Sequence, residues 1–173
     1  LKKAKIKMGD IEKVGMGLAG VDSDIDRRNV QNLLSPYFKK SKEDLIIVND
    51  VVAGLFWGSP HGIGVSVVAG TGSNAYASNG RGRECFTSGL GRMLAEQGSA
   101  LWLTQKMLRA VGKSYDGRGP RSLLEKVYVD HFGAKDVRDS MKYLHELYRD
   151  KAKLAALAPL VEKAAKKGDK VAK

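Results

Sequence analysis

The chain has 173 residues, 43% of them hydrophobic, which is enough for one globular domain or two small lobes. No stretch approaches the roughly 18 apolar residues that span a bilayer, and no apolar signal-peptide core follows the amino-terminal lysines, so we predict no membrane partner. The single cysteine, Cys85, excludes an internal disulfide and a multi-cysteine metal or iron–sulfur site within the chain, and it predicts a soluble, cytoplasmic protein.

The net charge of +11 makes nucleic acid a partner to consider. Most of the excess lies in residues 1–13 and 151–173, where lysines outnumber acids. The lysines of the second segment fall on the polar side of a helical pattern. We therefore interpret them as a solvated face and predict no nucleic-acid partner, with polyanion binding as the alternative.

The first part of the chain alternates apolar runs with helical patterns. The predicted elements are a buried strand over 13–19, a helix over about 25–35 that stops near Pro36, a β-branched core strand over 45–48 and a helix over about 50–57. Strands that alternate with helices are typical of a sheet covered by helices, so the predicted fold class is α/β.

The pattern changes after Pro60, and we place a domain boundary at about 58–61, between residues 1–60 and 61–173. The elements predicted beyond it are a strand over 63–69, a tight turn at 70–72, a returning strand over 74–78, and helices over about 92–111, 121–131, 136–148 and 154–165. Asp169 is a candidate cap for one further helix. Since the sequence lacks a starting methionine and ends as that helix begins, we expect it to be truncated at both ends.

Asn49 and Asp50 follow the predicted strand over 45–48 directly. Ligands of sheets with covering helices bind beyond the carboxyl ends of the strands. A carboxylate at this position could accept a hydroxyl proton during phosphoryl transfer. The alternative is that Asn49 or Asp50 only caps the following helix.

The segment Gly70-Thr71-Gly72-Ser73-Asn74 is the strongest candidate for a binding loop. Two glycines let the backbone approach an oxyanion, and their N–H groups can donate to phosphate oxygens. The Asn74 amide can both donate to and accept from sugar hydroxyls. An ordinary hairpin turn is the alternative.

A third cluster joins a glycine turn to a helix. Gly89-Leu90-Gly91-Arg92 leads to Ala95-Glu96-Gln97-Gly98-Ser99. If this turn faces the hairpin, Glu96 could bind sugar hydroxyls; the alternative is a helix start with solvated polar residues. No group of residues has the spacing of a metal site, so we assign no metal ligand.

Taken in order, these segments resemble the BadF/BadG-type ATPase and N-acetylglucosamine kinase family, over essentially the whole chain. The family belongs to the hexokinase, actin and heat-shock ATPase superfamily. The resemblance implies two ribonuclease-H-like lobes, truncated here at both ends, with residues 1–60 in the first lobe and residues 61–173 in the second, which carries a helical insertion. It also implies a kinase that uses ATP and Mg²⁺ to phosphorylate the 6-hydroxyl of an amino sugar, and it is compatible with a homodimer.

The resemblance implies a role for each candidate residue. The implied roles are a catalytic base for Asp50, phosphate binding for Gly70, Thr71, Gly72 and Ser73, and sugar binding for Asn74, Gly89, Leu90 and Glu96. Two of these positions depart from the family, since Glu96 stands where an aspartate is usual and Leu90 where a tryptophan is frequent. The family's Asp-Gly-Gly phosphate loop and its adenine-side glycine pair have no match, so we expect the 173 residues alone to be inactive.

Two alternatives share the same fold. One is an ATPase that activates a radical dehydratase or benzoyl-CoA reductase through a cysteine-ligated iron–sulfur cluster, for which this chain offers only Cys85. The other is a noncatalytic module that senses sugar or binds polyanions.

Overall fold

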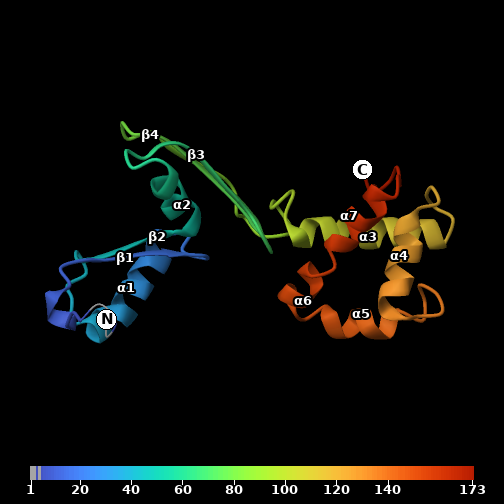
Figure 1. Cartoon of the computed structure of the whole chain (residues 1–173), viewed down its shortest axis with the longest axis horizontal. Helices are drawn as coiled ribbons and strands as arrows, with labels where there is room; N and C mark the ends of the chain where they lie inside the picture. The colour runs from blue at the N-terminus through green and yellow to red at the C-terminus, as the bar shows by residue number, and fades with distance from the viewer. Residues whose placement is uncertain (1–2, 4) are drawn as a thin grey trace. The chain divides into compact units, whose positions relative to one another are not determined.

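The structure is a computed structural model that describes residue 3 and residues 5–173, and its chain divides into two compact units (Figure 1). The first unit holds the described residues up to Val68 together with Asn74–Gly89. The second holds Ala69–Ser73 and Leu90–Lys173. The division into lobes at residues 58–61 stays a prediction about the whole protein.

A parallel pair of strands forms the first layer of the first unit. Strand β1 (Val14–Leu18) pairs with β2 (Leu45–Asn49) in a register that sets Leu18 opposite Asn49. Helix α1 (Asp24–Phe38) connects them and covers one face, where Val21, Leu45 and Ile47 are buried. A short 3₁₀ helix, η2 (Met8–Asp10), precedes β1.

Helix α1 does not stop at Pro36 as predicted but continues to Phe38. A proline one turn from the end removes a single hydrogen bond of the helix, which is a smaller loss than in a helix interior. The helix ends instead at Lys39, whose φ of 52° is left-handed and whose N–H bonds back to the Ser35 carbonyl.

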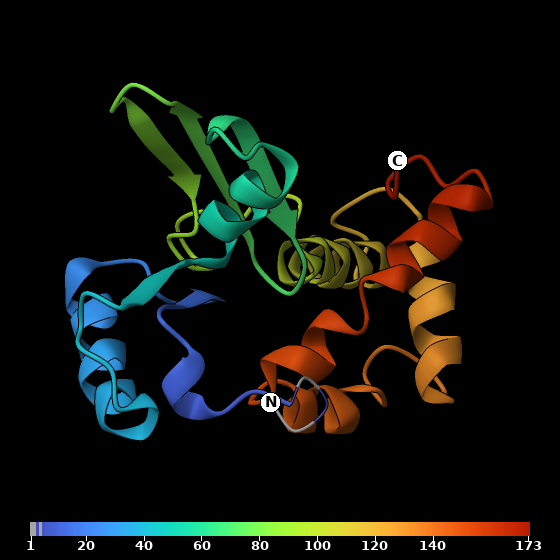
Figure 2. The ribbon, with the colours of Figure 1, turned by 60° about the vertical axis from the view of Figure 1, so that its left-hand side comes forward.

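The second layer of this unit is a three-stranded sheet under a helix. Its strands β3 (Ile63–Ala69), β4 (Ser73–Asn79) and β5 (Glu84–Ser88) lie in that order, with β4 and β5 antiparallel. Helix α2 (Asp50–Gly58) lies over the sheet, as Figure 2 shows. Tyr76 of β4 is buried against Val51 and Leu55 of α2, so the face of β4 that carries Tyr76 is the one the helix covers.

The second unit is helical. Its helices are α3 (Ala100–Tyr115), α4 (Leu123–Phe132), α5 (Met141–Leu147), α6 (Lys151–Ala155) and α7 (Pro159–Lys166). They enclose one apolar core, whose buried members include Leu101, Met107, Val111, Leu124, Val127, Tyr128, Leu154 and Leu160. Thr104 of α3 is fully buried and donates to the Leu154 carbonyl, which ties α3 to α6.

Three sequence predictions differ from the structure. Strand β5 was not predicted, since four of its five side chains are exposed and show no alternation. Helix α3 begins at residue 100 rather than 92, because Glu96 and Gly98 have left-handed φ values of 71° and 81°. The last predicted helix is two helices, because Pro159 starts a new one.

Asp169 joins the end of α7 to the start of α4. It accepts from the Val171 and Ala172 N–H groups, the pattern of the helix cap predicted for it, although no helix follows within residues 169–173. The same carboxylate accepts from the Leu123 N–H at 2.6 Å and from the Ser122 hydroxyl. Among the described residues, no helix combines the length and apolar character needed to traverse a bilayer.

Candidate functional site

A buried asparagine organises the carboxyl end of β2. Asn49 is 5% exposed, and its side-chain oxygen accepts from the Val51 N–H at 2.9 Å, so it is the cap of α2. Its amide nitrogen donates to the Asp22 carboxylate at 2.7 Å and to the Val21 carbonyl at 3.4 Å. The capping alternative therefore applies to Asn49, and Asp50 is the first residue of the helix.

Asp50 is half-buried, and its carboxylate accepts no hydrogen bond within the part of the chain that the structure describes. Its position is fixed by the backbone. A Cβ on Gly17 of β1 would lie 2.5 Å from the Ala53 Cβ and 3.6 Å from the Asp50 Cα. Only glycine lets β1 approach the first turn of α2 so closely, which holds Asp50 at the edge of the parallel pair.

The predicted binding loop, Gly70–Ser73, is fixed to the start of α3. The Gly70 and Thr71 carbonyls accept from the Ala100 and Leu101 N–H groups at 2.9 and 3.2 Å. The Ser73 hydroxyl donates to the Gln97 carbonyl at 3.0 Å. Ser99, fully buried, caps α3 by accepting from the Trp102 N–H.

The loop leaves donors available. The Gly70 N–H bonds to the Gly72 carbonyl at 2.9 Å, whereas the N–H groups of Thr71 and Gly72 donate to no acceptor among the described residues. Thr71 is exposed, so a ligand can reach this part of the loop. Two adjacent free amides on a glycine-containing turn are typical of a site for an anionic oxygen.

Glu96 lies beside this loop in a strained conformation. A Cβ on Gly72 would meet the Glu96 carboxylate at 3.1 to 3.2 Å, so the carboxylate occupies the space that a side chain at residue 72 would fill. A φ of 71° costs a residue other than glycine about 1–2 kcal/mol and persists only where the surroundings impose it. The structure thus brings Glu96 to the predicted loop.

Asn74 and Gly89 form a third contact, at the ends of β4 and β5. Asn74 is opposite Ser88 in the register, and a Cβ on Gly89 would lie 2.8 to 2.9 Å from the Asn74 amide group. The Asn74 side-chain oxygen is buried and has no hydrogen-bond partner. An acceptor of this kind is costly to leave unpaired, which points to a ligand that donates to it.

The site residues predicted from the sequence therefore fall into two sets. Asp50, Asn74 and Gly89 belong to the first unit, and the loop residues 70–73, Leu90 and Glu96 belong to the second. Leu90 is 69% exposed. The sequence analysis missed Asp22 and Ser99, whose roles depend on partners distant in the sequence or on the true start of α3; polar residues beyond two neighbouring strands were the available signal for Asp22.

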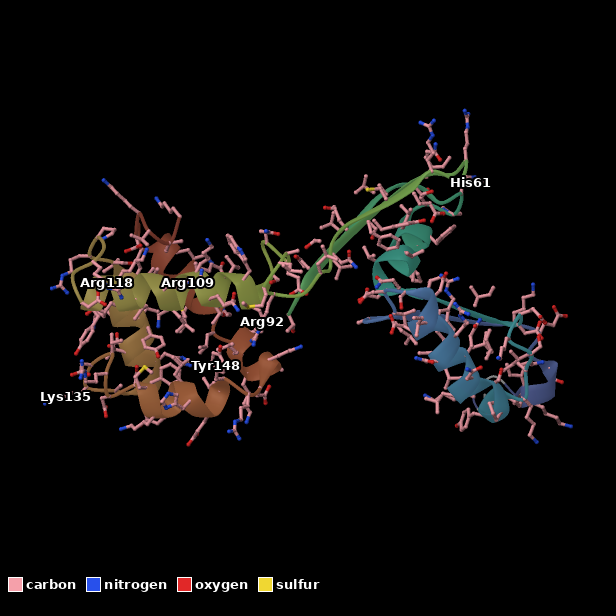
Figure 3. All side chains as sticks on the ribbon, turned by 180° about the vertical axis from the view of Figure 1, so that it is seen from behind. His61, Arg92, Arg109, Arg118, Lys135 and Tyr148 are labelled. Carbon is pink, nitrogen blue, oxygen red and sulfur yellow. The ribbon has the colours of Figure 1, made fainter. Side chains whose placement is uncertain are left out.

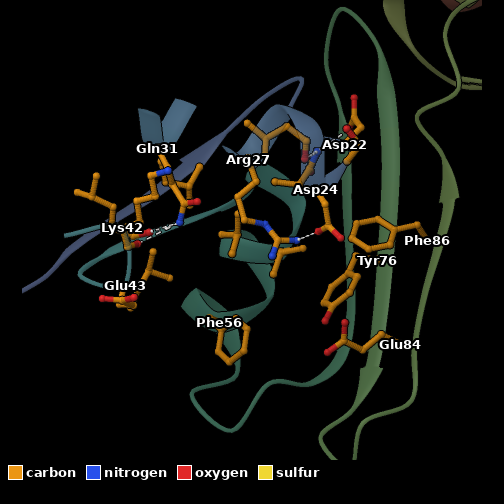
Figure 4. A pocket seen from close by; sticks show the side chains of 18 residues that line it. Asp22, Asp24, Arg27, Gln31, Lys42, Glu43, Phe56, Tyr76, Glu84 and Phe86 are labelled. Atoms are coloured by element: carbon orange, nitrogen blue, oxygen red, sulfur yellow. Dashed lines mark hydrogen bonds and ion pairs between the residues drawn. The ribbon is translucent and has the colours of Figure 1, made fainter. Parts of the chain in front are cut away.

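A hollow of about 720 Å³ lies in the first unit, between α1, β2, α2 and β5 (Figure 4). Neither Asp50 nor Asn74 lines it. Its walls include the Asp24–Arg27 ion pair and Tyr76. Burial, together with the neighbouring Glu84 carboxylate, raises the pKa of the Tyr76 phenol. No group of three metal-binding side chains occurs in the described part of either unit.

Known proteins resemble the chain along its whole length. A curated N-acetylmuramic acid/N-acetylglucosamine kinase from Clostridium acetobutylicum is 30% identical over 173 residues, which are 100% of this chain and 56% of the relative. An N-acetyl-D-glucosamine kinase from Dictyostelium discoideum is 26% identical over 163 residues, 93% of this chain and 51% of the relative. The chain thus spans about half the length of the curated relatives it matches.

Solved structures give the fold. A candidate N-acetylglucosamine kinase from Chromobacterium violaceum matches with a TM-score of 0.67 and 27% identity, covering 89% of this chain and 51% of that one. Another, from Porphyromonas gingivalis, matches with a TM-score of 0.66 and 21% identity, covering 91% and 53%. They confirm the predicted α/β fold of the sugar kinase type.

The sequence pattern of the BadF/BadG/BcrA/BcrD ATPase family matches residues 1–173, the entire chain. This match confirms the resemblance inferred from the order of the glycine motifs. The chain belongs to the BadF/BadG/BcrA/BcrD ATPase family.

Proposed function

We propose that the full-length protein is a sugar kinase that transfers the γ-phosphoryl group of ATP to the 6-hydroxyl of an amino sugar. The names of the curated relatives support the substrate class. The observation that carries the proposal is the buried, unpartnered side-chain oxygen of Asn74, which directly follows the binding loop in sequence. A sugar hydroxyl is a donor of the size and polarity that such an acceptor needs.

Asp50 is the proposed catalytic base. Its carboxylate accepts no hydrogen bond from the described residues, so it is available to take the proton of the attacking hydroxyl. The Asp22–Asn49 bond and the Gly17 contact hold the first turn of α2, which limits the positions that the carboxylate can adopt. Such positioning provides much of the catalysis of phosphoryl transfer.

The free amides of Thr71 and Gly72 fit a phosphate oxygen of ATP, with the Thr71 and Ser73 hydroxyls beside them. ATP supplies the transferred group when bound. Mg²⁺ accompanies its phosphates in this proposal, and we assign it no protein ligand, since the described residues contain no suitable group of three.

Asn74, Gly89, Leu90 and Glu96 are the proposed sugar-binding residues. Gly89 is needed because the Asn74 amide fills the space of its missing side chain. Glu96 can offer a carboxylate to sugar hydroxyls from beside the loop. We assign activity to the full-length protein and none to the 173 residues alone, and we propose a cytoplasmic location, where ATP and a reducing environment are available.

ADP release by the full-length protein tests the proposal. We expect release to depend on N-acetylglucosamine, glucosamine or N-acetylmuramic acid, and Asp50→Asn to lower kcat by about 10²–10⁴ while sugar binding persists, because the base but not its size is removed. The control is Asp44→Asn, at the opposite end of β2, where the carboxylate accepts from the Ser41 hydroxyl.

Two outcomes would contradict the proposal. An Asp50→Asn enzyme that keeps more than about a tenth of the wild-type kcat would exclude Asp50 as the base. ADP release that ignores every sugar would favour the alternative of an ATPase activator.

A further inference from the structure

The outward face of α3 carries cations and no carboxylate. The helix buries Leu101, Thr104, Met107, Val111 and Ser114 in the core of the second unit. Lys106, Arg109 and Lys113 lie on the opposite face and are exposed, because residues three or four apart share a face of a helix. Neither aspartate nor glutamate occurs between residues 100 and 115.

Other cations of this unit are neutralised locally. Their ion pairs, all with carboxylates three or four residues away, are Arg121–Glu125, Lys126–Asp130, Lys142–Asp139, Lys153–Asp150 and Lys166–Glu162. By contrast, Arg92, Lys106, Arg109 and Lys113 form no ion pair within residues 5–173. Their positive charge is therefore available to an anion from solution.

Aromatic rings hold two of these cations. The Lys106 ammonium lies 5.2 Å from the centroid of the Trp102 ring. The Arg92 guanidinium lies 5.8 Å from the centroid of the Tyr148 ring, and Figure 3 shows these two side chains close to each other below the start of α3. A cation–π contact restricts a cation without cancelling its charge, so the two groups are positioned but not neutralised.

A hollow of about 160 Å³ lies between these cations. Arg92, Lys106, Arg109 and Trp102 line it together with Gln97 and Gln105, and no carboxylate does. Arginine can donate two parallel hydrogen bonds to a phosphate, lysine acts as a point charge, and a glutamine amide adds neutral donors. A second hollow of about 350 Å³ shares Lys106 and Arg109 and adds Lys113.

We propose that Arg92, Lys106 and Arg109, beside Trp102, form a binding site for the phosphate group of a small molecule. The site uses none of the residues of the Gly70–Ser73 loop and does not rest on the proposed kinase activity. The short run of cations favours a small anion over a nucleic acid, because Lys106 and Lys113 are only about 10 Å apart along the helix at ~1.5 Å per residue.

The test is titration of the 173-residue chain with inorganic phosphate and with glucose 6-phosphate, followed by calorimetry at constant ionic strength. We expect saturable binding of both, with glucose 6-phosphate tighter if the ligand is a phosphorylated sugar and the two equal if it is free phosphate. The double variant Lys106→Gln/Arg109→Gln should raise Kd by about tenfold or more, since charged hydrogen bonds are lost. Arg92→Gln should raise it separately.

The matched control is Lys163→Gln/Lys167→Gln, which removes the same charge from exposed, unpaired lysines of the same unit. It should change Kd less than about twofold, because exposed charges beyond a Debye length are screened. Circular dichroism checks that each variant is folded. An equal loss in the control, or no saturation by about 10 mM phosphate, would overturn the proposal. So would tighter binding of a DNA duplex with a steep salt dependence, which would identify a nucleic-acid surface.

Discussion

The side-chain amide of Asn49 donates a 2.7 Å hydrogen bond to the carboxylate of Asp22, which joins the segment after β1 to the carboxyl end of β2. The other end of the same amide caps α2. One buried side chain thereby links two strands and the helix that carries Asp50.

Replacing Asp22 with alanine should lower the free energy of unfolding by about 1–3 kcal/mol, because the buried Asn49 amide loses its charged acceptor. Urea unfolding of the chain measures the change. Asp24→Ala is the comparison, since its ion pair with Arg27 is exposed and should contribute less than about 1 kcal/mol. Equal losses in the two variants would show that the Asp22 bond has no special weight.

Replacing Gly89 with alanine should raise the KM for sugar of the full-length enzyme by about tenfold or more, because the added methyl group displaces the Asn74 amide that we assign to a sugar hydrogen bond. Gly91→Ala separates this effect from backbone strain. Gly91 has a φ of 79°, similar to the 69° of Gly89, but a Cβ there would meet nothing within 4 Å. Both variants share the cost of an alanine in the left-handed region, so a KM that rises equally in both would remove Asn74 from the sugar site.

Asp169 should make the stability of the chain depend on pH in the acid range. Burial raises the pKa of this carboxyl, but hydrogen bonds from the Leu123 and Ala172 N–H groups, the Ser122 hydroxyl and the Val171 N–H outweigh burial and leave the pKa lowered. The unfolded chain therefore binds the proton more tightly. The stability that this group contributes is present above the ordinary aspartate pKa of about 3.9 and is lost as the pH falls through the lower folded value.

The measurement is the free energy of unfolding of wild type and Asp169→Asn between neutral pH and about pH 3. We expect the variant to be less stable at neutral pH and the difference to shrink on acidification. A difference that stays constant over this range would mean that the carboxylate is not a net source of stability in the folded state.

The full-length enzyme should discriminate weakly among N-acetylglucosamine, glucosamine and glucose. Leu90 offers no aromatic face for an acetamido group, and a lost apolar contact changes selectivity by only about 1–3 kcal/mol. Glu96 is also one methylene longer than the aspartate usual in the family. The ratio of kcat/KM values decides the point, and a preference for N-acetylglucosamine above roughly a thousandfold exceeds what such a contact supplies.

Local patterns predicted most of the fold. The β-branched runs of β2 and β3 and the capping residue Ser122 of α4 carry their signals within a few residues, and those elements lie where the sequence places them. Strand β5 is exposed on nearly every residue, so its existence depends on pairing with β4 rather than on its own pattern. The start of α3 depends on the left-handed conformation of Glu96, which propensity opposes.

The site was predicted to a similar extent. The glycine loop and the position of Asp50 followed from short motifs. The Asn49–Asp22 bond spans 27 residues and the approach of Gly89 to Asn74 spans a hairpin, so neither is visible to a pattern within one segment.

The attachment of the Gly70–Ser73 loop to α3 has an electrostatic consequence. The Gly70 and Thr71 carbonyls, which accept from the first turn of α3, belong to the same peptide groups as the free N–H groups of Thr71 and Gly72. In a trans peptide the C=O and N–H bonds point in opposite directions, so these two peptide dipoles align with the helix macrodipole. Hydrogen-bonded groups in a chain polarise one another. The positive end of α3 is therefore extended by one peptide layer, from the helix terminus to the Thr71 and Gly72 amides.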